Sequence, residues 1–254
     1  PTGSGKSTTL YATLGDVARP EINIITVEDP VEFRMRGINQ VQVNNKAGMT
    51  FAAALRSILR ADPDVVLIGE IRDQETANIA IEASLTGHLV LSTLHTNDAP
   101  SAVTRLTEMG VEPFLLSSSL AAVMAQRLAR RLCKKCKRQD TATEAELRTL
   151  GVPHMPDTPL PTIWRPVGCR ECANTGYSGR VAIQQVMGVD STMEDLIARG
   201  ATSIDIDKAA KEQGMTTLRK DGWQKALQGI TSVEEVLRLF DRADLLPDIA
   251  AGVL

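Results

Sequence analysis

Pro1-Thr2-Gly3-Ser4-Gly5-Lys6-Ser7-Thr8 opens the chain and decides its fold class. This run matches the phosphate-loop pattern G-x-x-x-x-G-K-[ST] from its second position onward, so the first glycine and the strand that feeds the loop lie outside the sequence. We therefore expect the chain to be part of a longer polypeptide. In such a loop, glycines let backbone N–H groups face phosphate oxygens, the lysine reaches the β- and γ-phosphates, and the serine hydroxyl binds Mg²⁺. The predicted nucleotide-binding residues here are Thr2, Gly3, Ser4, Gly5, Lys6, Ser7 and Thr8, with Ser7 on Mg²⁺.

The composition is that of a globular protein with one large domain or two smaller ones. The chain has 254 residues, of which 43% are hydrophobic and 23% are charged. Its net charge of −3 gives no attraction to nucleic acid, so we expect no nucleic-acid partner. No apolar run approaches the roughly 18 residues that a membrane-spanning helix requires.

Short apolar runs alternate with helical patterns in the first half of the chain. Continuous β-branched runs such as Val65-Val66-Leu67-Ile68 predict parallel strands that are covered on both faces. Strands that alternate with helices behind a phosphate loop predict an α/β fold with a parallel sheet. The predicted strands are 22–27, 38–43, 65–68 and 89–93.

Local signals also place the helices. Thr50 and Asp73 are N-cap residues ahead of helical patterns, and Pro113 is typical of a first helical position. We predict that the helix from Pro113 ends near Leu132. From Ser191 onward the pattern is helical again, which predicts a C-terminal helical region.

Acidic residues follow two of the predicted strands, at the edge of the sheet where nucleotides bind in parallel α/β folds. Glu70 follows run 65–68 across Gly69, in the position of a Walker B acid that serves Mg²⁺ or the attacking water. Glu28 follows run 22–27 and can polarise a water for in-line attack. His88 and His95 bracket run 89–93, so one of them can reach the same edge. The alternative for each residue is a helix cap or another structural role.

Four motifs, in order along the chain, resemble those of the secretion-ATPase superfamily, specifically the type II secretion and type IV pilus assembly ATPases. They correspond to the Walker A, Asp box, Walker B and His box motifs, at 1–8, 25–32, 55–73 and 87–99. The resemblance implies a RecA-like P-loop NTPase core that works as a homo-hexamer. It also implies a peripheral location on the cytoplasmic face of the inner membrane, with an inner-membrane platform protein and a cytoplasmic adaptor as partners.

The resemblance implies an ATP-hydrolysing motor subunit for pseudopilus or pilus assembly, with ATP and Mg²⁺ as cofactors. Glu28 and Glu70 become the leading catalytic carboxylates, with His95 as a third catalytic candidate, and Arg60 and Arg72 become candidates that bind the nucleotide. Two alternatives stay open: a conjugation-type motor that moves nucleic acid, and a scaffold subunit that binds nucleotide without turnover. Because arginines from elsewhere complete such sites, we expect the isolated chain to bind nucleotide weakly and to hydrolyse it slowly.

The four cysteines form two C-x-x-C pairs separated by 32 residues, which predicts a closed, structural Cys₄ zinc site. Disulfides would require an oxidising compartment, and a redox pair would not account for both motifs. A cluster of basic residues near the first pair fits either a solvated face that offsets the charge of the thiolates or a contact with acidic lipid or a partner. The predicted zinc ligands are Cys133, Cys136, Cys169 and Cys172.

We predict three parts of the chain from these patterns. They are an ATPase core at 1–131, a tetracysteine module at 132–179 and a helical subdomain at 180–254.

Overall fold

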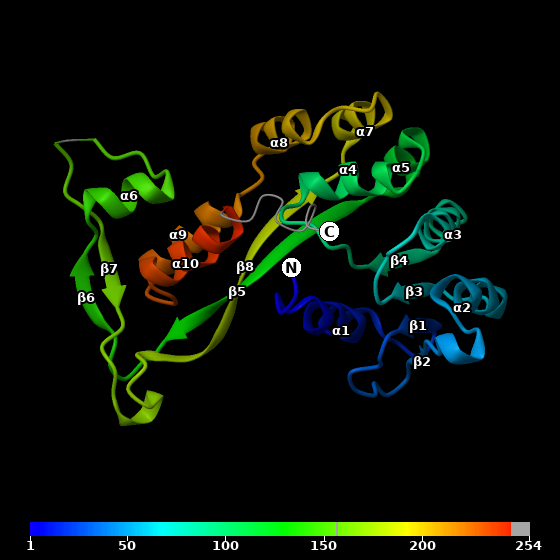
Figure 1. Ribbon diagram of the computed structural model, residues 1–254, viewed down its shortest axis with the longest axis horizontal. Coiled ribbons are helices and arrows are strands. Elements are labelled where there is room, and N and C mark those ends of the chain that lie inside the picture. The colour runs from blue at the N-terminus through cyan, green and yellow to red at the C-terminus, as the bar shows by residue number, and fades with distance from the viewer. Residues whose placement is uncertain (156, 245–254) are drawn as a thin grey trace, which may run out of the picture.

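The computed structural model describes residues 1–155 and 157–244, and its central element is a parallel four-stranded sheet (Figure 1). The strands are β1 Ile24–Glu28, β2 Asn39–Gln42, β3 Val65–Ile68 and β4 Leu89–Ser92. Their order is β2-β1-β3-β4, and every neighbouring pair is parallel. In this register Ile24 pairs with Val65, which in turn pairs with Leu89. The predicted α/β fold with a parallel sheet is confirmed.

Helices cover both faces of the sheet. They are α1 Lys6–Val17, α2 Phe51–Ile58 and α3 Gln74–Leu85. Successive strand residues point to opposite faces, so each strand contributes to two layers. Leu14 of α1 packs with Ile24 and Leu67 on one face. Val27 and Ile68 belong to the cluster that α2 and α3 join on the other face, which explains why these strands read as continuous apolar runs.

The predicted caps begin the helices as expected. Thr50 Oγ1 accepts a hydrogen bond from the backbone N–H of Ala53 at 3.2 Å, and Asp73 Oδ1 accepts one from Thr76 at 2.8 Å. Short 3₁₀ turns complete this half of the chain, at η1 Asn45–Ala47 and η2 Leu59–Ala61.

The predicted helix from Pro113 to Leu132 is wrong. The chain forms a short helix, α5 (Pro113–Ser119), and then a long strand, β5 (Ala122–Leu132). Leu120 has extended backbone angles, with φ −88° and ψ 112°. The residues of β5 have helical propensity, since most are Ala, Met, Gln, Leu and Arg. Pairing with a distant strand overrides this propensity, as often happens in sheets.

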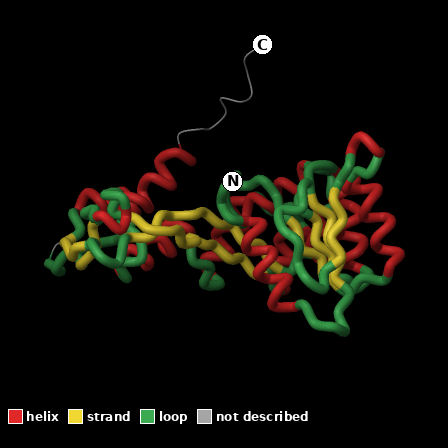
Figure 2. Tube along the Cα trace, turned by 90° about the horizontal axis from the view of Figure 1, so that it is seen from below, coloured by secondary structure: helices red, strands yellow, loops and turns green. Residues whose placement is uncertain are grey.

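That distant strand is β8 (Tyr177–Gly188), which pairs antiparallel with β5 to form a two-stranded ribbon. Figure 2 shows the ribbon extending from the sheet region toward a smaller group of elements at the other end of the molecule. Those elements include an antiparallel pair of short strands, and the cysteines lie on them or directly next to them. They are β6 Arg138–Thr141, α6 Glu144–Leu150, β7 Thr162–Arg165 and η3 Arg170–Cys172.

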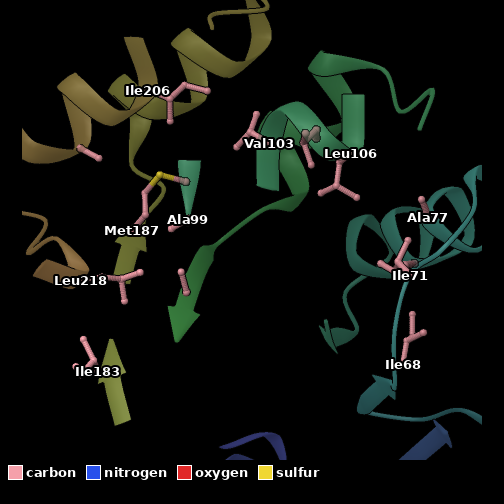
Figure 3. Packing of buried hydrophobic residues seen from close by; sticks show 14 of the residues in the cluster. Ile68, Ile71, Ala77, Ala99, Val103, Leu106, Ile183, Met187, Ile206 and Leu218 are labelled. Carbon is pink, nitrogen blue, oxygen red and sulfur yellow. The ribbon is translucent and has the colours of Figure 1, made fainter. Parts of the chain in front are cut away.

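Helices complete the core along the ribbon, which confirms the predicted helical pattern from Ser191 to residue 244. They are α4 Pro100–Glu108, α7 Ser191–Ala198, α8 Ser203–Glu212, α9 Leu218–Leu227 and α10 Val233–Asp244. The remainder of that prediction, 245–254, lies outside the described residues. Ile183 and Met187 of the ribbon are buried near Leu218 and Ile206, while Ile68 and Ile71 pack at the sheet (Figure 3). Across 1–155 and 157–244, no helix has both the length and the apolar character to cross a membrane.

Candidate nucleotide site and tetracysteine cluster

The phosphate loop has the backbone shape that its glycines predict. Gly3 and Gly5 have φ angles of 73° and 86°, in the left-handed region that glycine tolerates, and α1 begins directly after Gly5. Lys6 Nζ lies 2.9 Å from the carbonyl oxygen of Pro1, so the ammonium group folds back over the loop. Ser7 and Thr8 are exposed in the first turn of the helix. Free N–H groups at a helix N-terminus and a nearby ammonium group suit a polyphosphate.

Glu28 closes β1 and is almost fully buried, with 5% of its surface exposed. Three neutral groups donate hydrogen bonds to its carboxylate. The Tyr11 hydroxyl donates to Oε2, Thr26 Oγ1 lies 2.5 Å from Oε1, and Gln40 Nε2 lies 3.2 Å from Oε1. These contacts fix the carboxylate at the carboxyl edge of the sheet, and Tyr11 brings the early turns of α1 to the same edge.

Tyr11 was not predicted as a site residue. Burial and the hydrogen bond to Glu28 raise the pKa of Tyr11 to about 12, so the phenol stays a neutral donor over the physiological range. Its oxygen also accepts a hydrogen bond from the backbone N–H of Glu32 at 3.2 Å. The only signal in the sequence is its position one helical turn after Ser7, which is too weak to identify it.

Glu70 follows β3 at the same edge and has two cationic or polar partners. Arg72 donates a hydrogen bond to Oε1, and His95 Nε2 lies 3.2 Å from Oε2. The hydrogen bond from Arg72 lowers the pKa of Glu70 and His95 adds to this effect, although partial burial opposes it. Glu70 is therefore a carboxylate at neutral pH, and its side chain keeps 15% of its surface exposed.

The two histidines lie at opposite ends of β4. His95 lies beyond the carboxyl end of β4, next to Glu70. His88 lies at the opposite end of β4, where Nδ1 is 2.9 Å from the carbonyl oxygen of Ala83. His88 thus contacts the last turn of α3, whereas His95 shares the edge with the acidic residues.

Arg60 does not join this group of residues. It lies on η2, which leads into the amino end of β3, whereas Glu70 follows the carboxyl end. Its neighbour Arg56 pairs with Glu75 of α3 at 2.7 Å. A role for Arg60 in nucleotide binding stays a prediction.

The four cysteines gather into one cluster whose sulfurs all lie within 4.8 Å of one another. Cys133 and Cys169 are 3.9 Å apart, Cys136 and Cys172 are 3.8 Å apart, and Cys169 and Cys172 are 3.8 Å apart, measured between the sulfurs. A tetrahedral zinc ion with Zn–S distances of about 2.3 Å separates its sulfurs by about 3.8 Å. All four residues are free thiols. The donor set suits Zn²⁺, and these three distances match those of a tetrahedral site.

Backbone N–H groups surround the cluster and favour thiolates. Gly168 donates to Cys136 at 3.3 Å, while Cys169 and Gly176 donate to Cys172 at 3.2 and 3.3 Å. Burial alone raises a thiol pKa, but the two N–H donors outweigh it and lower the pKa of Cys172 to about 6. Burial raises the pKa of Cys136 to about 11.

Comparisons with known proteins show which family the chain resembles. A family model described as "Type II/IV secretion system protein" matches residues 1–238. The chain is 52% identical over 239 residues to the type II secretion system protein E of Aeromonas hydrophila, covering 94% of this chain and 47% of that protein. It is 52% identical over 237 residues to the type IV pilus assembly ATPase PilB of Thermus thermophilus, covering 93% of this chain and 26% of that protein.

The chain thus spans about half the length of the type II secretion relatives that it matches, and less of the pilus relative. Among solved structures, the pilus retraction motor PilT with bound ADP is similar with a TM-score of 0.69 and 26% identity, covering 99% of this chain and 61% of that chain. With the family model matching most of its length, the chain belongs to the type II/IV secretion system protein family.

Proposed function

We propose that this chain is the ATP-hydrolysing part of a motor subunit that powers pseudopilus or pilus assembly, in type II protein secretion or type IV pilus biogenesis. The observation that carries the proposal is the meeting of three features at one edge of one parallel sheet. These are the phosphate loop, the buried Glu28 carboxylate and the Glu70–Arg72–His95 group. The names of the relatives, which include a pilus assembly ATPase, support the same function.

In this proposal each group at the edge has one task. The loop amides and Lys6 neutralise charge on the β- and γ-phosphates, and Ser7 holds Mg²⁺. Glu70 or Glu28 orients the attacking water, since both are carboxylates fixed by hydrogen bonds. Arg72 and His95, which now contact Glu70, lie where they can respond to the γ-phosphate. Arg60, at the opposite end of the sheet, requires a neighbouring copy to reach a nucleotide.

The finer points of the expected architecture belong to the same proposal. We propose a RecA-like core and a structural Zn²⁺ held by the four cysteines. We also keep the division at 1–131, 132–179 and 180–254, and regard the middle part as a module carried by the ribbon, since β5 and β8 pair across both boundaries. As a working assembly we propose a homo-hexamer on the cytoplasmic face of the inner membrane, with the platform protein and adaptor of the machine as partners.

Replacing Glu70 by Gln tests the ATPase proposal. We expect the Glu70→Gln variant to keep Mg²⁺–ATP binding and to lose turnover by about a hundredfold, because a preorganised charge is removed. Glu28→Gln measured beside it shows which carboxylate acts on the water. Glu75→Gln, an exposed residue of α3, is the matched control and should leave turnover unchanged.

Three outcomes would contradict the proposal in different ways. Unchanged turnover in Glu70→Gln would remove Glu70 from the reaction. ATP binding without turnover in the unmodified protein would favour the scaffold alternative. Turnover that rises on addition of DNA would favour the nucleic-acid motor, which the net charge of −3 disfavours.

A further inference from the structure

Gln126 of the ribbon contacts the phosphate loop directly, although more than a hundred residues separate them. Its Nε2 donates a hydrogen bond to the carbonyl oxygen of Ser4 at 2.8 Å. Its Oε1 accepts one from Thr9 Oγ1, in the first turns of α1, at 3.0 Å. The side chain is buried, with 7% of the residue exposed. We infer that Gln126 is a positioning residue that sets the orientation of the phosphate loop for the nucleotide.

The contact with Ser4 acts on one peptide plane of the loop. In a trans peptide the C=O of Ser4 and the N–H of Gly5 point in opposite directions. When Gln126 holds this carbonyl toward the ribbon, the N–H of Gly5 is turned to the opposite side of the peptide, away from the ribbon. Backbone N–H groups aimed in this way are what a phosphate loop presents to its anion.

The ribbon lies close enough for the contact to be specific. A Cβ atom added to Gly5 would meet Gln126 Nε2 at 3.0 Å and the Leu128 side chain at 3.3 Å. Gly5 therefore has two constraints, a left-handed φ of 86° and the close approach of β5. The loop therefore packs directly against the ribbon.

A second glutamine fixes the orientation of the Gln126 amide. Gln184 pairs with Gln126 in the register of the ribbon, and its Nε2 donates to Gln126 Oε1 at 2.9 Å. A flipped amide would set an N–H group against the Gln184 donor and an oxygen against the Ser4 carbonyl oxygen. Gln184 therefore keeps Gln126 Nε2 directed at Ser4. Met124 and Leu128, both uncharged, flank Gln126 on the same face of β5. Lys6, the charged residue of the facing loop, lines the same pocket as Gln126, and its ammonium group donates to the carbonyl oxygen of Pro1.

Replacing Gln126 by Glu tests the inference, which rests on the proposed nucleotide site. A carboxylate cannot donate to the Ser4 carbonyl, and it brings negative charge to an anion site. We expect Mg²⁺–ADP to bind Gln126→Glu about tenfold more weakly than the unmodified protein at pH 8. Burial raises the pKa of such a carboxyl, and its protonated form donates again. The loss of affinity should therefore shrink at pH 5.5.

Gln185→Glu is the matched control. Gln185 is the next residue on β8, is equally buried at 4% exposed, and faces the opposite side of the ribbon. Its Oε1 accepts from the backbone N–H of Ala99 at 3.2 Å, which a carboxylate oxygen also does. We expect its affinity for Mg²⁺–ADP to match the unmodified protein at both pH values. Equal losses in the two variants, or a loss in Gln126→Glu that does not change with pH, would overturn the inference.

Gln184→Ala provides a second test in case Gln126→Glu does not fold. Gln184 is only half-buried, and its removal takes away the donor that fixes the Gln126 amide while leaving the loop contacts possible. We expect a two- to threefold loss of Mg²⁺–ADP affinity, and no loss would again overturn the inference. Because the readout is binding, an absence of ATP turnover with normal binding would contradict the proposed function alone.

Discussion

At the edge of the sheet that carries the proposed nucleotide site (the nucleotide edge), side chains from α1, β1, β2 and the segments after β3 and β4 converge, and several of them still face solvent. Glu70 keeps 15% of its side chain exposed and His95 keeps 56%. In the tetracysteine cluster, by contrast, two C-x-x-C pairs place four sulfurs within 4.8 Å of one another, and backbone N–H groups surround them. A reacting nucleotide needs room to enter and leave, whereas a structural metal ion needs a closed shell of ligands. The two regions differ as these two tasks require.

The ribbon touches both regions. β5 contacts the phosphate loop through Gln126 and runs directly into Cys133, while β8 begins five residues after Cys172. Between them lies Arg130, which donates to the buried Glu235 of α10. Burial acts to raise the pKa of Glu235, but hydrogen bonds from Arg238 and Arg130 hold it at about 2. The ribbon is thus anchored to the helices between its two ends. We therefore expect a substitution at one end to have a smaller effect at the other end.

Loss of the metal should have the largest effect and should be confined to one region. We expect Cys172→Ser to lower zinc content from about one per chain to near zero and to reduce the melting temperature sharply, because structural zinc supplies folding free energy. Mg²⁺–ADP affinity should fall less than in Gln126→Glu. Elemental analysis of protein purified under reducing conditions, thermal melting and ADP titration measure the three quantities.

Val167→Ser is the matched control for the metal prediction, since Val167 is exposed and lies two residues before Cys169 of the second C-x-x-C pair. It introduces the same residue without removing a ligand, so zinc content should stay unchanged. If Cys172→Ser abolishes nucleotide binding as completely as it abolishes zinc binding, the two regions are not separable in the way that we describe. If the unmodified protein contains no zinc, the metal proposal fails.

The two tyrosines offer a smaller and more symmetrical test of the comparison. The Tyr11 hydroxyl bonds to a buried carboxylate, whereas the Tyr177 hydroxyl, at the start of β8, lies 2.8 Å from the neutral Ser232 Oγ. Hydrogen bonds to charged groups stabilise more than neutral ones. We expect Tyr11→Phe to lower the free energy of unfolding by about 2 kcal/mol and Tyr177→Phe by about 1 kcal/mol.

Denaturant unfolding measures both losses, and ATP turnover separates them further. Only Tyr11→Phe should also reduce turnover, because only Tyr11 holds a residue of the nucleotide edge. With the pKa of Tyr11 at about 12, its hydroxyl stays protonated and its contribution should not vary between pH 6 and 9. Equal stability losses and equal turnover in the two variants would mean that the Glu28 contact carries no more than an ordinary hydrogen bond.

The same contrast explains what the sequence could predict. Glu70 and His95 each follow a strand of a parallel sheet, so their meeting at one edge follows from strand order alone. The cluster was predicted from the spacing of its cysteines. Tyr11 and Gln126 carry no motif, and Gln126 meets Ser4 only because residues 122–132 form a strand. That strand exists through pairing with β8, far along the chain, which local propensity does not encode.

The smallest predicted effect is that of removing a helix cap, and it tests whether the cysteine-bearing end unfolds on its own. Thr143 and Glu146 form a capping box at the start of α6, and Thr202 and Asp205 form the same box at the start of α8. Removal of either threonine hydroxyl by alanine should lower the free energy of unfolding by about 1 kcal/mol.

The two helices differ in one respect. Glu146 also accepts from Arg165, whose guanidinium group lies 2.6 Å from Glu234 of α10. Because this arginine ties α6 to the helix that packs on the ribbon, we expect Thr143→Ala to shift one cooperative unfolding transition, as Thr202→Ala does. A separate early transition in Thr143→Ala alone, followed by circular dichroism and zinc release, would show instead that the cysteine-bearing end is an independent folding unit.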